Sequence, residues 1–219
     1  GIPMTAALRA AWAPAVRENF VGDAMHRDLR EALDGRFSAD EHALLAAFYG
    51  SEFGVEVSGL ERAVTQLPPA AQLAAREEGL SLASRADETR HAQIEEMLAL
   101  ASADMATQIV GQSVRSMLIG MAMNGQQGDI EVPWEEIDAQ LAAIMPGIAA
   151  DITTTQRAVM FFTYQDLTEA ELEQYLGFLR TDAARKLHAL VAYSAGVIVT
   201  ERMERFGESL AAALSRVNT

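Results

Sequence analysis

The sequence contains no cysteine, and this absence excludes several kinds of chemistry. Without thiols the chain has no disulfide framework, no thiolate nucleophile, no cysteine-bound zinc and no iron–sulfur cluster. Aromatic residues make up only 6% of the 219 residues, and Lys186 is the single lysine. Strand signals are scarce as well, because sustained alternation of apolar and polar residues is missing. We therefore do not expect a sheet.

Long apolar runs are also missing. No run reaches the roughly 18 to 20 residues that are needed to span a bilayer. The net charge of −14 makes nucleic-acid backbones and anionic membrane surfaces unfavourable partners, because charge repulsion opposes each encounter. We therefore expect neither a nucleic-acid partner nor a transmembrane segment.

The residues that are abundant favour helices. Half of the chain is hydrophobic, about a fifth of it is alanine, and apolar residues recur at helical spacing almost throughout. A long helical segment is expected from about Ala70 to Ala101, and glycine and proline mark a linker at 124–133. These patterns predict an all-α helical bundle that forms a single compact domain over residues 1–219.

An internal repeat relates two parts of the chain at an offset of 130 residues. The predicted copies run over 23–66 and 153–206. The matched positions of the first copy are Phe37, Ser38, Glu41, Phe48, Tyr49, Ser51 and Gly54. Those of the second copy are Leu167, Thr168, Glu171, Leu172, Phe178, Thr181 and Ala184. We interpret these residues as structural, because they correspond to helix caps, a turn and one apolar stripe.

Each copy begins with the residue pair of a capping box. Ser38 is followed three residues later by Glu41, and Thr168 by Glu171, so each pair can satisfy two free N–H groups at a helix start. A second serine or threonine stands thirteen residues after the first and is expected to cap the next helix. Each copy is therefore predicted to be a capped αα-hairpin.

These residues resemble a known family. The pattern Phe-(Ser/Thr)-x-x-Glu-Leu, then Phe-Tyr-x-Ser-x-x-Gly followed by Lys, is similar to that of the bacterial family called domain of unknown function 2059. The first copy departs from this pattern at His42 and Glu56, and the second at Leu179, Thr181 and Ala184. The resemblance implies an all-helical protein, often exported to the periplasm, with no established activity or cofactor, and it transfers no catalytic residue.

The start of the chain bears on its compartment. The sequence begins at Gly1 rather than at methionine, which favours a chain whose signal peptide has been removed. Together with the missing cysteine and the family resemblance, this start predicts a periplasmic location. A cytoplasmic location is the alternative.

One group of residues has the chemistry of a metal site. Glu88, His91 and Glu95 share one face of the predicted helix, and carboxylates with an imidazole suit iron, manganese or zinc. Helical di-metal proteins need this Glu-x-x-His motif twice, and the chain contains it once. We therefore favour a solvated helix face held by charge pairs, and we predict neither a metal nor another cofactor.

Three hypotheses for the function follow. The first is a non-enzymatic interaction or structural protein with a protein partner or self-association. The second is a binder of a small apolar ligand or lipid between the two repeat halves. The third is a metal-dependent protein that uses the Glu-x-x-His helix.

Overall fold

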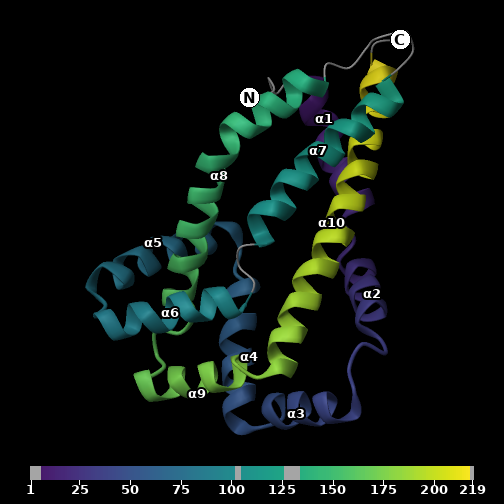
Figure 1. Ribbon diagram of the computed structural model, residues 1–219. Helices are drawn as coiled ribbons and strands as arrows, with labels where there is room; N and C mark the ends of the chain where they lie inside the picture. Colours follow the sequence, from purple (N-terminus) through teal and green to yellow (C-terminus); the bar gives the residue numbers. More distant parts are fainter. Residues whose placement is uncertain (1–5, 102–104, 126–133, 218–219) are drawn as a thin grey trace. The chain divides into compact units, whose positions relative to one another are not determined.

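The computed structural model describes residues 6–101, 105–125 and 134–217. All regular structure in these ranges is helical, so the prediction of an all-α helical bundle is confirmed (Figure 1). The helices are α1 (Ala6–Asn19), α2 (Gly22–Leu33), α3 (Ala39–Tyr49), α4 (Glu52–Thr65), α5 (Pro69–Arg85), α6 (Glu88–Leu100), α7 (Met105–Gly125), α8 (Trp134–Thr163), α9 (Glu169–Leu179) and α10 (Asp182–Val217). Among these helices none is long and apolar enough to cross a bilayer.

The described helices group into two compact units, where the sequence predicted a single domain over 1–219. The first unit contains α1, α2, α7, the start of α8 and the end of α10, and the second contains the remaining helices. The boundaries inside helices lie after Pro146 in α8 and after Ala192 in α10. The physical reason for the division is that each unit buries a hydrophobic cluster of its own.

The predicted linker and repeat bounds can be compared with the described residues and the two units. Most of the linker, 126–133, lies outside the described residues, and 124–125 belong to the last turn of α7. The bounds 23–66 and 153–206 each extend from the second unit into the first. The residues that define the repeat, however, all lie in the second unit.

The first unit has its core around Phe206 of α10. The edge of the Trp12 ring meets the Phe206 ring with centroids 4.9 Å apart, and Phe20 lies on the same ring at 6.0 Å. Glycines allow α7 and α10 to approach closely. A Cβ added at Gly120 would lie 1.9 Å from the Glu204 carbonyl oxygen, so only glycine fits this crossing.

The second unit has its core around α9. This helix packs against α6, and five of its eleven residues are buried. Leu172 and Leu176 of α9 and Ile94 of α6 are fully buried. The second unit therefore holds the larger of the two hydrophobic clusters.

The segment from Ala70 to Ala101 forms two helices rather than the one that the sequence predicted. Helix α5 ends at Arg85, and Ala86 has an extended backbone. Asp87 then starts α6, because its carboxylate accepts a hydrogen bond of 2.8 Å from the Arg90 backbone N–H. An aspartate N-cap of this kind competes with a continuous helix, and here the cap prevails over the high helix propensity of the segment.

Candidate functional site

Both segments that the sequence predicts to be repeat copies contain the expected capping box. The Ser38 hydroxyl accepts a hydrogen bond from the Glu41 N–H at 3.2 Å, and the Glu41 carboxylate accepts one from the Ser38 N–H at 2.7 Å. Thr168 and Glu171 repeat this arrangement at 3.3 and 2.7 Å. The pKa of each glutamate is lowered. The largest cause for Glu41 is its hydrogen bond with the Lys186 side chain, and the largest cause for Glu171 is its hydrogen bond with the Thr168 backbone N–H.

The turn inside each hairpin differs at one position. In the first copy the Ser51 hydroxyl caps Gly54 at 3.0 Å, and a Cβ at Gly54 would lie 1.9 Å from the Phe48 carbonyl oxygen. In the second copy Thr181 caps Ala184 at the longer distance of 3.3 Å. The first turn is therefore closed so tightly that it requires glycine, whereas the second accommodates a methyl group.

The two hairpins meet through equivalent residues. Phe48 and Phe178, which correspond at the offset of 130, stack with centroids 3.6 Å apart and ring planes 4° apart. Tyr175 also stacks on Phe48, with centroids 5.8 Å apart and ring planes 6° apart. Contact between equivalent residues is the arrangement expected when two copies face each other about a twofold axis. The rings occupy this interface, where the sequence had placed an apolar ligand.

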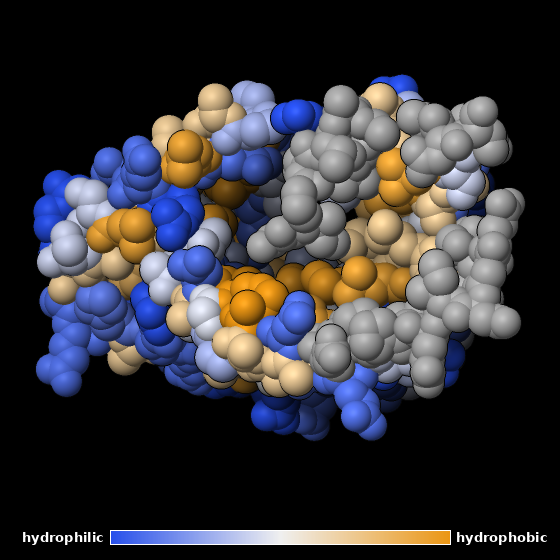
Figure 2. All heavy atoms as spheres, turned by 90° about the horizontal axis from the view of Figure 1, so that it is seen from above, coloured by the Kyte–Doolittle hydropathy of each residue, from blue (hydrophilic) through white to orange (hydrophobic). Residues whose placement is uncertain are grey.

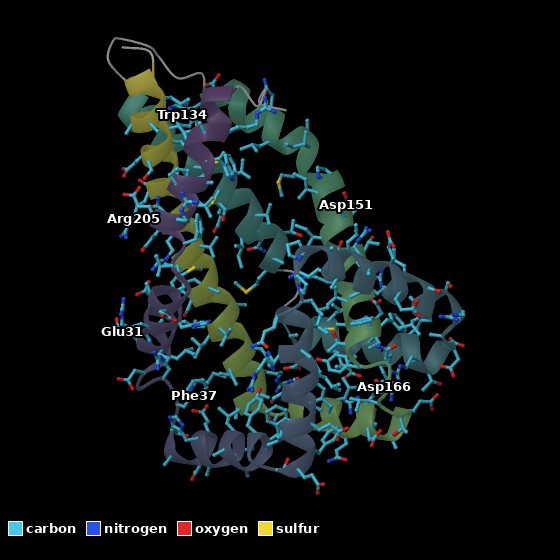
Figure 3. All side chains as sticks on the ribbon, turned by 180° about the vertical axis from the view of Figure 1, so that it is seen from behind. Glu31, Phe37, Trp134, Asp151, Asp166 and Arg205 are labelled. Carbon is cyan, nitrogen blue, oxygen red and sulfur yellow. The ribbon has the colours of Figure 1, made fainter. Side chains whose placement is uncertain are left out.

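One ion pair also joins the two copies. The single lysine, Lys186 of α10, donates hydrogen bonds of 2.8 and 2.9 Å to the two carboxylate oxygens of Glu41. Its ammonium lies 5.3 Å from the centre of the Phe37 ring. Phe37 precedes α3 and is labelled in Figure 3. The residue equivalent to Lys186 in the first copy is Glu56, so this charge pair exists on one side only.

Helix α6 carries Glu88, His91 and Glu95, and each of these side chains has a different environment. Glu88 is exposed in the first turn. The Nε2 atom of His91 lies 2.9 Å from the Ala83 carbonyl oxygen, and Glu95 forms an ion pair with Arg157 of α8. Within the described ranges no group of three or more histidine, aspartate or glutamate side chains could hold a metal ion. The geometry therefore gives no support to a metal centre on α6.

A polar network lies inside the second unit, and the sequence did not indicate it. One carboxylate oxygen of Glu61 in α4 accepts hydrogen bonds of 2.7 Å from the hydroxyls of both Tyr164 and Tyr175. Burial raises the pKa of each of these tyrosines, and burial also lowers the pKa of the neighbouring His188. The Nε2 atom of His188 is buried and has no hydrogen-bond partner within the part of the chain that the structure describes. These hydrogen bonds join α4 to α9 and to the turn that follows α8.

Of two pockets within the described part of the second unit, the better suited to a ligand has a volume of about 430 Å³ and lies between α4, α5 and α8. We call it the α4/α5/α8 pocket. It is lined by Val64, Thr65, Pro69, Gln72, Leu73, Ala75, Arg76, Thr155 and Val159. Its volume lies within the range of small-molecule sites, and its lining combines apolar side chains with a few polar groups.

The crossing of α5 and α8 positions the polar groups of this pocket. A Cβ at Gly79 would lie 1.9 Å from the Ala158 carbonyl oxygen, so the two helices approach as closely as a glycine allows. One turn earlier on each helix stand Arg76 and Thr155. The Arg76 Nε–H donates a hydrogen bond of 3.0 Å to the Thr155 hydroxyl, which fixes the guanidinium at the edge of the pocket.

A second pocket, of about 320 Å³, lies beside the α5–α6 junction. Arg90, one of the two arginines that line it, donates hydrogen bonds to the carbonyl oxygens of Tyr164 and Leu167 and so holds the turn between α8 and α9. Burial lowers the pKa of Arg90. This guanidinium is engaged in the fold, which makes the second pocket less suited to a ligand.

Comparison with known proteins finds no match: no family model, no curated protein and no solved structure is similar to this chain. The resemblance to the domain of unknown function 2059 family stays a prediction from the residues of the two hairpins.

The sequence missed the residues of both the network and the pocket. Glu61 and its tyrosine partners are 103 and 114 residues apart in the chain, and Arg76 and Thr155 are 79 residues apart. None of these residues stands in a motif, so spacing could not have found them. A glycine inside the predicted helix, Gly79, was the only local signal of a close helix crossing.

Proposed function

We propose that this chain is a non-enzymatic binding protein that takes a small, mainly apolar molecule in the α4/α5/α8 pocket. The observation that supports this proposal is the combination of an apolar lining, a volume of about 430 Å³ and two polar side chains fixed at the edge. The proposal keeps the ligand-binding hypothesis from the sequence and moves the site away from the interface between the hairpins.

The pocket has an apolar wall that a substitution can test. Leu73 lines the pocket and is 57% exposed, so a bound ligand could bury apolar surface of this side chain. Leu80 stands two turns later on the same helix, is 38% exposed and does not line the pocket. The two leucines therefore form a matched pair in which only one should matter for binding.

The experiment uses octan-1-ol as a neutral apolar probe and measures its binding by saturation-transfer NMR. Leu73→Asp should abolish the signal, because a charge in the apolar wall opposes burial of the alkyl chain. Leu80→Asp should keep it. Native mass spectrometry of the purified protein should also detect any molecule that copurifies. Equal probe signals from both variants, or no signal from the unmodified protein, would contradict the proposal.

A protein partner or self-association is the second candidate, and it has its own observation. Val55 on α4 is 60% exposed and Leu44 on α3 is 39% exposed. Figure 2 shows a different face, seen from above, on which apolar residues also lie among hydrophilic ones. Concentration-dependent association that Val55→Ser removes would support this role, and a monomer at every concentration would contradict self-association.

We also propose the periplasm as the location, with the cytoplasm as the alternative. The lack of cysteine and the family resemblance of the two hairpins support this proposal. Fractionation of cells that express the natural gene should recover the protein with periplasmic markers. Recovery with cytoplasmic markers would overturn it.

A further inference from the structure

The α4/α5/α8 pocket has a cation whose charge no described acidic side chain neutralises. Arg76 is half-buried at the pocket edge, and its one hydrogen-bond partner there is the neutral hydroxyl of Thr155. No ion pair between Arg76 and a carboxylate occurs among residues 6–101, 105–125 and 134–217. The guanidinium therefore keeps most of its five N–H donors for another acceptor.

Other arginines of the second unit contrast with Arg76. Arg157 pairs with Glu95, Arg180 with Glu96 and Glu173, and Arg85 with Glu78. In a chain with a net charge of −14, carboxylates are abundant, yet among the described residues none forms an ion pair with the guanidinium at this apolar pocket. A half-buried cation that faces an apolar lining is complementary to a ligand with one anionic group.

We propose that the ligand of this pocket is a small aliphatic monocarboxylate. This inference rests on the proposed binding function and adds the chemical class of the ligand. The carboxylate accepts hydrogen bonds from the free N–H groups of Arg76, and the planar guanidinium suits the two oxygens of a carboxylate. The alkyl chain lies along Val64, Leu73 and Val159, which removes its apolar surface from water.

Thr155 has a positioning role in this arrangement. Its hydroxyl accepts from the Arg76 Nε–H, and the Gly79 crossing fixes the distance between the two helices. The guanidinium is thus held in one orientation before the ligand arrives, which lowers the entropy cost of binding. Loss of the hydroxyl should weaken carboxylate binding without removing the charge.

The test compares three probes with the same alkyl chain, namely octanoate, octan-1-ol and octylammonium, on the complete chain by isothermal titration calorimetry. The unmodified protein should bind octanoate about tenfold more tightly than octan-1-ol, as expected for charge-assisted hydrogen bonds, and octylammonium most weakly. In Arg76→Gln the preference for octanoate over the alcohol should disappear while the alcohol still binds. Thr155→Val should reduce the preference, and Arg76→Lys should retain part of it.

Arg62→Gln is the matched control, because Arg62 is exposed on α4 and does not line the pocket. It removes the same charge and should leave the preference unchanged. Equal affinity for octanoate and octan-1-ol in the unmodified protein would overturn the inference and leave the proposed binding function standing. A preference that Arg76→Gln and Arg62→Gln reduce equally would also overturn it, because the effect would then come from net charge. No binding of any probe would overturn both proposals.

Discussion

The two hairpins of the second unit have the same local design and very different burial. In α9 of the second copy, Leu172 and Leu176 are fully buried beneath α6. At the equivalent positions of α3 the first copy has His42 and Ala46, both exposed, and only Leu45 of that helix is buried. Both helices nevertheless begin with a complete capping box. Local hydrogen bonds therefore define the hairpin, while tertiary contacts decide how much each copy contributes to the core.

This comparison predicts that equivalent substitutions have unequal effects, and the largest difference concerns the core face. Leu172→Ala should lower the free energy of unfolding by about 3 kcal/mol, because it removes buried methyl groups and leaves a cavity. The matched change His42→Ala in α3 should stay within about 0.5 kcal/mol, as expected for an exposed side chain. Urea unfolding of both variants measures the difference. Similar losses would mean that α3 is as central to the core as α9.

The next prediction concerns the turn inside each hairpin. Gly54→Ala should destabilise the protein by about 2 kcal/mol, since the added methyl group would clash with the Phe48 backbone carbonyl and open the turn. The reverse change in the second copy, Ala184→Gly, should cost only about 1 kcal/mol through lower helix propensity. Both values come from chemical denaturation. A Gly54→Ala variant as stable as the unmodified protein would show that the first turn can widen like the second.

A smaller loss of stability is expected when a hydrogen bond of the Glu61 network is removed. Tyr175 of the second copy donates to Glu61 of the first, and the position equivalent to Tyr175 in the first copy is Leu45. Tyr175→Phe should cost about 1 kcal/mol, because a carboxylate oxygen of the half-buried Glu61 loses one of its two tyrosine donors. Tyr193→Phe, at a tyrosine that is 62% exposed, is the control and should change little.

The same network predicts a dependence on alkaline pH. Burial raises the pKa of Tyr164 and Tyr175 on folding, so both keep their protons more firmly in the folded state. A group of this kind contributes stability below its unfolded pKa of about 10, and this contribution is lost as the pH rises above that value. Tyr175→Phe should make the alkaline loss of stability shallower. An unchanged slope would show that Tyr175 does not resist ionisation.

The sequence could predict what depends on neighbours in the chain. The pairs Ser38–Glu41 and Thr168–Glu171 lie three residues apart, so their capping boxes follow from spacing alone. The helix end at Arg85 was missed because the alanine- and leucine-rich segment around it favours a continuous helix, and the cap at Asp87 is a single residue.

The two units and the candidate site depend on contacts between distant parts of the chain. Phe178, which stacks on Phe48, the donors to Glu61 and the partner of Arg76 all lie more than seventy residues away in the chain. Apolar periodicity indicates that a helix has a buried face but not which helix covers it. The division into two units was unpredictable for the same reason.

The finest difference between the copies is electrostatic. The Lys186 ammonium contributes most to lowering the pKa of Glu41 below its ordinary value of 4.5, whereas the pKa of Glu171 is lowered mainly by the Thr168 N–H. A carboxylate whose pKa falls on folding stabilises the protein above its unfolded pKa, and this contribution is lost as the pH decreases. Lys186→Gln should therefore raise the pKa of Glu41 and leave that of Glu171 unchanged in carboxyl NMR titrations.

The converse substitution tests whether the hairpins are related by a twofold axis. Position 56 corresponds to position 186, and Glu41 corresponds to Glu171. Under a twofold relation, the ammonium of Glu56→Lys should therefore lie near Glu171, as that of Lys186 lies near Glu41. If the copies face each other as the Phe48–Phe178 stack indicates, the pKa of Glu171 should fall and that of Glu41 should stay constant. Glu52→Lys, one turn earlier on α4, makes the same charge change and should affect Glu171 less. A Glu171 pKa that responds equally to both substitutions would argue against the twofold relation, because only net charge would then be acting.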